Sequence, residues 1–486
     1  CIQMDEYMEN FYLFAIERYK ENPAVAGMLY EKQMAYKKLL FLGSEKVANS
    51  IYATNDIQLI DRYDKWFSQK TYLTKLYRLN KDELAKDKVN LARLQAMNQK
   101  GAIYLDSKST TFSNQTHAKL DTWKFDVKLK LRFDEAAVEI IRAPKENGEV
   151  AYIALIVHKT TENHPEMVVL KNGKELETTL LKTYQANINS KQLDKSSYGV
   201  FWKEIAAHLK DKKSVIIAPN GAYSKINISS LWNSETEKYV FEDTKVSYLS
   251  STNYVKVRSS TYYLSFETAQ DPVVIGRANY AISTSQQAQT AQKYQTKYSS
   301  HIGITDSEIQ TQIKAELSKL KNKKIDNKQI TNTFIQNKIT PKSYEGNLAL
   351  EDAIKSVENP KIVHLELEGY ASKEQESDLE TYLFHQLQST GLFFAGAKNG
   401  FPEHKEGMED GILTAYEMMN LKLTGTEMVV IPSFQRFEGD FANKITQALH
   451  TAGVKFVLLP LWKQNDAIVN EFVNLFYSNY FTLGKN

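Results

Sequence analysis

Apolar runs alternate with helical patterns along the last quarter of the chain, and this alternation limits the possible fold more than any other feature. Strand-like runs occupy 361–367, 391–396, 428–431 and 454–462, and helical patterns occupy 377–387, 411–421, 441–449 and 468–476. Apolar strands separated by helices of about 10 to 15 residues are typical of a mostly parallel sheet with helices on both faces. The sequence therefore predicts an α/β domain.

This domain extends well upstream of residue 361. Further strand-like runs lie at 136–143, 150–158, 167–170, 214–219, 245–250 and 272–276. The pair Asn220–Gly221 favours a tight hairpin turn, and the polar, low-complexity stretch 283–300 predicts a mobile surface loop or an insertion. We assign residues 119–486 to the α/β domain.

The first hundred residues have a different character. Tyr7, Phe11 and Phe14 recur at helical spacing, Gly43 can close one helix and Ser44 can begin the next. Paired helices without strands are typical of a helical hairpin or of the tail of a helical array. We expect residues 4–100 to be helical and the Ser/Thr-rich stretch 101–118 to be a connector, so that residues 1–118 form a helical segment.

Composition excludes several classes of function. The 61 basic and 58 acidic residues nearly cancel, so no nucleic-acid partner is indicated. No apolar segment reaches the roughly 20 residues that cross a bilayer, which predicts a soluble, cytoplasmic protein. No phosphate loop, dinucleotide motif or zinc-ligand spacing occurs, so we expect no cofactor and no metal. The single cysteine, Cys1, leaves one alternative open, a processed bacterial lipoprotein anchored to the cell envelope.

Several segments together resemble the CHAT domain, a caspase-like peptidase domain that is often fused to TPR helical repeats. They occur in the order "SVIIAPNGAYSKINISSLW", "KVSYLSS", "PVVIG", "KIVHLELEGYAS", "EDGILTAYEMMNLKLTGTEMVVIPS" and "AGVKFVLLPLWKQNDAIVNEFVNLFYSNY". The stretch "DGILTAYEMMNLKL", which begins at Asp410, matches the family pattern without a gap. The resemblance implies a caspase-like α/β sandwich with its motif-bearing core at about 190–486, and it makes the helical segment resemble the end of a TPR array.

The resemblance also implies a Cys/His dyad at the ends of two neighbouring strands, where the imidazole balances the proton of the thiol. The sequence departs from this pattern at both positions. Glu368, just before Gly369, stands where the family has histidine, and Phe434 stands where it has cysteine. A phenyl ring has no nucleophilic atom, so the dyad is degenerate and we expect no peptidase activity.

Other residues near these strand ends offer weaker alternatives. His364 lies four residues before Glu368, about 13 Å along a strand, and we interpret it as a core histidine. Ser433 with Glu368 as its base would give an active hydrolase, although a lone carboxylate is a weak base for a serine hydroxyl. Pro432 and Pro460 stand where the family commonly has serine, and proline removes a backbone donor.

These observations predict a catalytically inactive CHAT pseudo-peptidase that acts through protein–protein interaction. We expect it to be a scaffold or a regulator of a partner protein, such as an active CHAT or peptidase relative. The candidate residual cleft consists of Ser433, Gln435, Arg436, Gly369, Asp410, Pro432 and Pro460.

Overall fold

The computed structural model describes most of the chain. It covers residues 2–39, 90–110, 121–145, 148–255, 271–294, 307–320, 328–371, 387–401, 408–419, 421–423, 425–432, 441–461 and 465–483, with residue 112 and single positions between 51 and 69. The chain divides into two compact units. Unit 1 combines Cys1–Leu42 with Lys119–Tyr263, and unit 2 combines Gly43–Ala118 with Leu264–Asn486.

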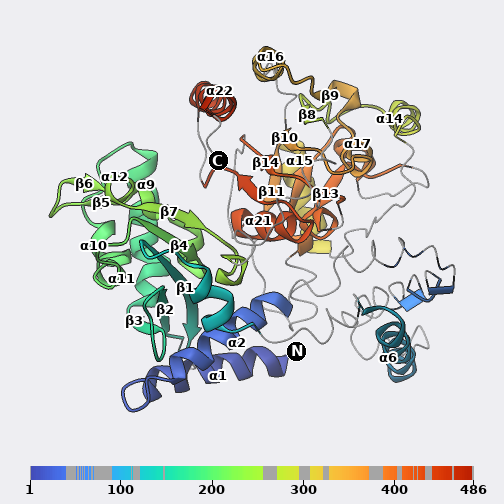
Figure 1. The fold of residues 1–486 in the computed structure, drawn as a ribbon. Helices are drawn as coiled ribbons and strands as arrows, with labels where there is room; N and C mark the ends of the chain where they lie inside the picture. The colour runs from blue at the N-terminus through green and yellow to red at the C-terminus, as the bar shows by residue number, and fades with distance from the viewer. Residues whose placement is uncertain are drawn as a thin grey trace. The chain divides into compact units, whose positions relative to one another are not determined.

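Unit 1 is built on a mixed five-stranded sheet in the order β3-β2-β1-β4-β7 (Figure 1). Strand β1 is antiparallel to β2 and parallel to β4, and β4 is parallel to β7. The strands span β1 (Glu135–Pro144), β2 (Val150–His158), β3 (Glu166–Leu170), β4 (Ser214–Ala218) and β7 (Lys245–Tyr248). A short hairpin, β5 (Trp232–Asn233) and β6 (Lys238–Tyr239), stands apart from this sheet.

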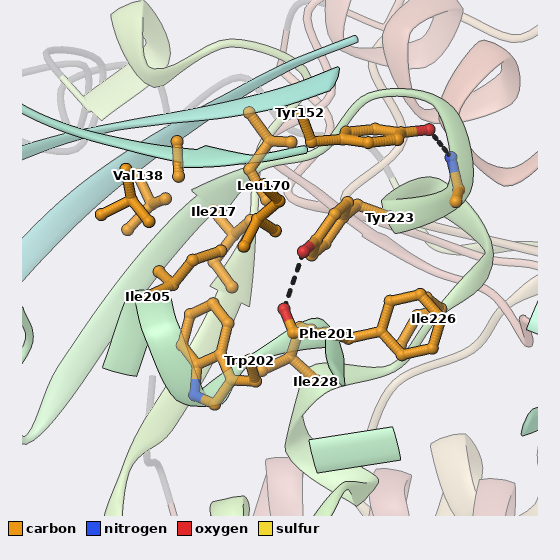
Figure 2. Close-up of a cluster of buried hydrophobic side chains, with 14 of the residues drawn as sticks. Val138, Tyr152, Leu170, Phe201, Trp202, Ile205, Ile217, Tyr223, Ile226 and Ile228 are labelled. Carbon is orange, nitrogen blue, oxygen red and sulfur yellow. Dashed lines mark hydrogen bonds between the residues drawn. The ribbon is translucent and has the colours of Figure 1, made fainter. Parts of the chain in front are cut away.

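The two faces of this sheet are apolar because side chains of a strand alternate between them. Val138 and Ile140 of β1 belong to one buried cluster, with Tyr223 and Phe201 (Figure 2). Ala137 and Ile141 belong to a second cluster, which contains side chains of the two N-terminal helices. Strands that are buried on both faces need apolar residues at every position, which explains the continuous runs in β1 and β2.

Short helices and turns of unit 1 complete these two layers. The first face is covered by segments between α8 and α12, and the second face by α1, α2 and a π-helical turn. Their bounds are α1 (Ile2–Arg18), α2 (Val25–Leu39), η1 (Trp123–Val127), η2 (Lys128–Lys130), α8 (Gly173–Glu175), η3 (Leu176–Leu180), α9 (Leu181–Asn189), α10 (Ser197–Phe201), α11 (Lys203–Ala206), η4 (Gly221–Lys225), η5 (Ile228–Ser230), α12 (Val240–Asp243) and η6 (Thr252–Tyr254).

Unit 2 contains a five-stranded sheet in which every pairing is parallel, in the order β15-β14-β10-β8-β9. A second, three-stranded antiparallel sheet has the order β11-β12-β13. The strands span β8 (Val273–Gly276), β9 (Lys342–Glu345), β10 (Ile362–Glu366), β11 (Gly369–Ala371), β12 (Thr390–Phe393), β13 (Ile412–Thr414), β14 (Met428–Val430) and β15 (Phe456–Leu458).

Two helices cover one face of the parallel sheet. Phe334 of α16 and Tyr477 of α22 pack against Val274, Ile362 and Met428 from three neighbouring strands. The helices of unit 2 are α6 (Leu91–Lys108), α14 (Thr284–Ala291), α15 (Ser307–Lys319), α16 (Lys328–Gln336), α17 (Glu351–Lys355), α19 (Ala397–Gly400), α20 (Ala415–Met418), α21 (Phe441–Thr451) and α22 (Asp466–Leu483), with the turn η8 (Gly346–Leu348). No helix in the described part of the chain is long and apolar enough to span a membrane.

Four local predictions are wrong. Residues 101–108 continue helix α6 and are not a connector, and 284–291 form helix α14 and not a loop. The predicted helix 411–421 begins as strand β13, because residues 412–414 pair with β12. Asn220–Gly221 begins a 3₁₀ turn after β4 and not a hairpin, and Gly221 has φ +56° there. The predicted helix 377–387 lies almost wholly outside the described residues.

The units also divide the chain differently from the predicted boundary at residue 118. Met8, Tyr12, Leu29 and Tyr30 of α1 and α2 are buried against β1 and β2, so the first two helices share a core with a sheet. Residues 2–39 are largely helical, as predicted, but the apolar side of these two helices packs in an α/β unit. The α/β residues, in turn, are distributed between two units with separate sheets.

Candidate functional site

The carboxyl ends of β10, β14 and β15 meet at one edge of the parallel sheet of unit 2, where open α/β sheets usually carry their functional groups. Val430 pairs with Leu458 and His364 pairs with Val430. Continuing these registers by two residues places Pro432 level with both Pro460 and Glu366. The structure therefore brings the ends of the three predicted strands together, as the sequence suggested.

Glu368 lies just beyond β10 and is held through its backbone. Its amide donates to the hydroxyl of Tyr280 at 3.1 Å, and its carbonyl accepts from the Phe393 amide at 2.8 Å. Only 4% of the residue is exposed. Burial raises the pKa of Tyr280, and the hydrogen bond from the Glu368 amide opposes part of that rise. The position that the family resemblance assigns to a histidine is thus a buried junction between two sheets, since β11 begins at Gly369.

His364 is a core residue, as predicted. It is completely buried, its Nδ1 lies 3.0 Å from the Tyr477 hydroxyl, and its Nε2 lies 3.6 Å from a carboxylate oxygen of Glu366. Tyr477 belongs to α22, and Glu366 lies two residues further along β10, so its side chain is on the same face of the sheet as His364. This imidazole supports the packing of α22 and has no access to a substrate.

The loop after β14 is described only as far as Pro432. Pro432 is buried and Pro460 is half-buried. Just before Pro432, the Ile431 amide donates to the Leu458 carbonyl at 2.8 Å. Ser433, Phe434, Gln435 and Arg436 lie outside the described residues.

The segment with the strongest family likeness forms a tightly bonded turn. Asp410 accepts a hydrogen bond from the Ile412 amide at 2.8 Å. Gly411 has φ +86°, which favours glycine, and an added Cβ would lie 2.8 Å from the Ala397 nitrogen. Thr414 and Glu417 cap helix α20 reciprocally, each side chain bonding the backbone amide of the other. These motif residues therefore shape the chain between β13 and α20.

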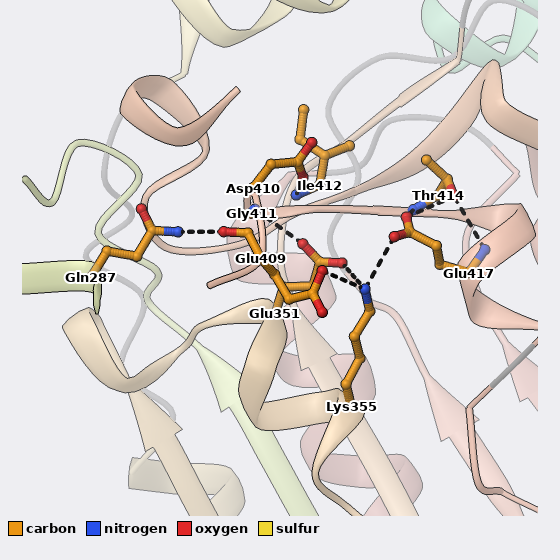
Figure 3. A network of polar contacts seen from close by, with 9 residues as sticks. All are labelled: Gln287, Glu351, Lys355, Glu409, Asp410, Gly411, Ile412, Thr414 and Glu417. Carbon is orange, nitrogen blue, oxygen red and sulfur yellow. Dashed lines mark hydrogen bonds and ion pairs between the residues drawn. The ribbon is translucent and has the colours of Figure 1, made fainter. Parts of the chain in front are cut away.

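The same turn is tied to α17 by one buried cation (Figure 3). The Lys355 ammonium lies 2.6 Å from Glu351, 2.9 Å from Glu409 and 3.0 Å from Glu417. The second oxygen of Glu351 accepts from the Gly411 amide at 3.0 Å, and Gln287 donates to the Glu409 carbonyl at 3.0 Å. We call Lys355, Glu351, Glu409 and Glu417 the lysine cluster.

Three carboxylates within 4.8 Å of one another resemble a metal-ligand set. Here, however, the lysine ammonium already lies among them and supplies the positive charge. Burial alone would lower the pKa of Lys355, but the three carboxylates outweigh it and the pKa is raised. Burial raises the pKa of Glu351 although Lys355 opposes that rise. The lysine cluster is a structural ion network.

Asp352 adds a further carboxyl to this region. Burial raises its pKa to about 6, and the neighbouring charge of Glu409 contributes to the rise. Its Oδ2 atom is buried and has no hydrogen-bond partner within the described part of the chain. Asp352 is therefore the group here whose protonation changes within an accessible pH range.

A second buried ion pair lies in unit 1, level with the carboxyl end of a parallel strand. Glu139 pairs in register with Ala218, the last residue of β4. One carboxylate oxygen of Glu139 is 2.5 Å from the Lys37 ammonium, and the other accepts from the amide and hydroxyl of Thr252 at 3.0 and 2.7 Å. Tyr30 donates to that hydroxyl at 2.9 Å. Both carboxylate oxygens of Glu139 therefore have buried partners.

Sequence reasoning missed Tyr280, the lysine cluster and the Lys37–Glu139 pair. A usable signal existed for two of them. Glu139 interrupts an apolar strand, and Glu351 and Lys355 stand four residues apart on a short helix. A charge inside a buried strand requires a partner, but the sequence does not say that the partner is more than a hundred residues away.

No curated protein matches the chain, but one family model does. The family model of the CHAT domain matches residues 193–486, which is more than half of the chain and includes parts of both units. The match contains the sheet edge at Glu368 and the turn from Asp410 to Glu417, whose geometry is described above. The chain therefore belongs to the CHAT domain family.

Proposed function

We propose that this CHAT domain protein is a pseudo-peptidase, which binds another protein without cleaving it. The observation that carries the proposal is the state of the former histidine position. Glu368 stands there and is buried, and its backbone amide and carbonyl are both hydrogen-bonded, to Tyr280 and Phe393. A carboxylate at this place provides no imidazole to accept a proton from a nucleophile.

The second half of the dyad is missing from the sequence itself. Phe434 occupies the position of the cysteine, and Cys1 is the only cysteine of the chain. Peptide-bond attack by a thiolate needs a sulfur beside a base. With Glu368 and Phe434 at the two positions, this site lacks both groups.

A fold without its catalytic residues can still bind a peptide, because a cleft holds a peptide through shape and hydrogen bonds and not through the nucleophile. We assign the protein the role of scaffold or regulator of a partner protein, for which an active peptidase relative is the candidate. The predicted role of the N-terminal helices as the end of a TPR-type array is less well supported, because α1 and α2 bury their apolar side against the sheet of unit 1. The scaffold role is consistent with polar networks that stiffen the domain, such as the lysine cluster.

The proposal is tested with a peptide library and the purified full chain. We expect no cleavage, and we expect Glu368→Gln and Ser433→Ala to leave this result unchanged. Cleavage that disappears in Ser433→Ala, while the matched surface variant Ser234→Ala keeps it, would support the alternative of an active serine hydrolase instead. Binding is tested by recovering partners from the native host with cross-linking and mass spectrometry.

The cellular compartment, cytoplasm or cell envelope, stays a prediction from the sequence. A cytoplasmic protein has an unmodified polypeptide mass, whereas an envelope lipoprotein carries acyl chains on Cys1 and partitions into detergent. The intact mass of the native protein distinguishes the two.

A further inference from the structure

The last helix of unit 2 has two apolar sides, and only one of them is covered. Val473 and Tyr477 of α22 are buried in the core with the sheet. Ile468, Phe472 and Leu475 follow one another at helical spacing and are 48%, 52% and 56% exposed. A helix that meets water on one side normally carries polar residues there. The exposed side of α22 is apolar instead.

The direction of this exposed side follows from helix geometry. Phe334 of α16 packs against Tyr477 and Phe481 of α22, with ring centroids 4.9 and 5.1 Å apart. At 100° per residue, Phe472 and Leu475 lie on the flank of α22 opposite to these contacts. The apolar stripe therefore faces away from α16. Because α16 packs over β8, the stripe faces the other end of the sheet, where β15 is the last strand.

Strand β15 continues the same surface. Phe456 pairs with Met428, which is in the core beneath α22, so both side chains lie on the face that carries the helix. Phe456 is nevertheless 60% exposed. Together, Phe456 on β15 and Ile468, Phe472 and Leu475 on α22 form what we call the edge surface.

The outer edge of β15 has no partner strand in the part of the chain that the structure describes, where β15 pairs with β14 alone. The Phe456 amide and the Leu458 carbonyl bond towards β14, so the peptide groups of Val457 and Leu459 point outward. The two outward residues, Val457 and Leu459, are apolar, whereas Lys455 and Pro460 flank this three-residue strand and limit how far a second strand can pair along it. Exposed apolar side chains gathered at such an edge are typical of an interface.

We propose that the edge surface is a self-association surface, through which two copies of this chain pair about a two-fold axis. A strand pairs with its own symmetry mate in the antiparallel sense, and an axis perpendicular to the sheet keeps both copies of α22 on one face. One rotation thus joins the two β15 edges and sets the two apolar stripes against each other. The inference does not depend on the loss of peptidase activity.

The area and charge of the surface suit a second copy. The two exposed phenylalanines leave about 220 Å² of apolar area, and the leucine and isoleucine add about 180 Å². Two copies would therefore bury about 800 Å² from these four side chains alone. The strand backbones and the half-buried Val457 and Leu459 bring the total above the roughly 1,000 Å² that a specific interface needs. The four side chains of the edge surface are uncharged, although α22 also carries the acidic residues Asp466 and Glu471 and no basic residue.

The experiment measures the mass of the full chain in solution by light scattering at about 20 µM. We expect twice the 55.7 kDa of one chain. Phe472→Glu is expected to give the single mass, because two buried carboxylates would face each other across the axis. Ile335→Glu is the matched control, since Ile335 is 53% exposed on the neighbouring α16 but outside the edge surface, and it should keep the double mass.

Hydrogen exchange separates strand pairing from association through the helix alone. The amides of Val457 and Leu459 should exchange slowly in the wild type and at least tenfold faster in Phe472→Glu. Leu475→Ser serves as a milder second variant, and far-ultraviolet circular dichroism checks that all variants are folded. A wild type with the mass of one chain overturns the proposal. So does a folded Phe472→Glu variant that keeps the double mass, or fast exchange at β15 in a wild-type dimer.

Discussion

Lys355 holds together three carboxylates from three parts of unit 2, namely Glu351 of α17, Glu409 before β13 and Glu417 of α20. Its side chain is 4% exposed, so little solvent screens these charges. The net contribution of such a network to stability is modest, since all four groups lose hydration. Removal of one member is costly, because the remaining charges have lost their partner.

We therefore predict that Lys355→Met lowers the free energy of unfolding of unit 2 by about 3 to 5 kcal/mol at pH 7. Pulse proteolysis in urea, read on peptides of residues 271–483, measures this change. The control is Lys422→Met, which removes an exposed pair with Glu358 and should cost less than about 1 kcal/mol. Equal effects of the two substitutions would contradict the structural role of the cluster.

Asp352 gives unit 2 a dependence on pH with a definite sign. The folded state raises the pKa of this carboxyl to about 6, so the folded state binds a proton more tightly than the unfolded chain does. Its contribution to stability is fully present below the unfolded pKa of about 4 and is lost as pH rises towards 6. At neutral pH the buried carboxylate is destabilising.

Asp352→Asn should accordingly raise the free energy of unfolding at pH 7 by about 1 to 3 kcal/mol, because an amide is not ionised. The gain should shrink towards zero at pH 4, where wild-type Asp352 is protonated. The same urea measurement at pH 4, 5, 6 and 7 gives the profile. Asp243→Asn, at an exposed position of unit 1, should show no comparable trend in unit 2. A gain that is independent of pH would refute the assignment.

Among the elements, the strands were the most predictable. The predicted apolar runs overlap β1, β2, β3, β10, β12, β14 and β15, because a buried strand has few alternatives to apolar residues. The short strands β9 and β11 were not predicted. Helix α14 was missed because its sequence, rich in Gln, Ser and Thr, has little apolar periodicity; Ser283 caps it and only Gln287 and Ala291 are buried. Local composition did not contain the tertiary contacts that select the helix.

The turn at 411–418 shows a different limit of prediction. Its pattern resembles the start of a helix, and a helix does begin at Ala415. The three residues before Ala415, however, form strand β13, which pairs with β12. Pairing with a strand twenty residues upstream is a non-local contact that helical spacing does not reveal. For the candidate site, the strand ends were readable from sequence, whereas the loss of the histidine stays a proposal that rests on the family resemblance. The partners of Glu368 were not, because Tyr280 and Phe393 come from distant segments.

At the scale of the whole molecule, the chain is organised by cores that its linear order conceals. The first two helices belong to the same unit as residues 119–263, whereas residues 43–118, which lie between these two stretches in the sequence, belong to the other unit. Tyr12, Leu29 and Met34 are buried against one face of the β1–β2 sheet. The Lys37–Glu139 pair adds a charge contact between α2 and β1. A sheet of this kind needs both faces covered to be stable in water.

Deletion of residues 1–39 should therefore unfold unit 1, because several side chains on that sheet face would each lose about 1.5 to 3 kcal/mol of burial. Limited proteolysis with mass spectrometry measures this, and we expect rapid cleavage throughout residues 121–255 in the deletion variant. The matched control is the double substitution Tyr7→Ser and Phe14→Ser, which alters the exposed side of α1 and should keep the protection of wild type. If residues 121–255 stayed resistant in the deletion variant, α1 and α2 would not be needed for the fold of unit 1, as expected for a separate helical array. Rapid cleavage would instead show that they are part of the fold of unit 1.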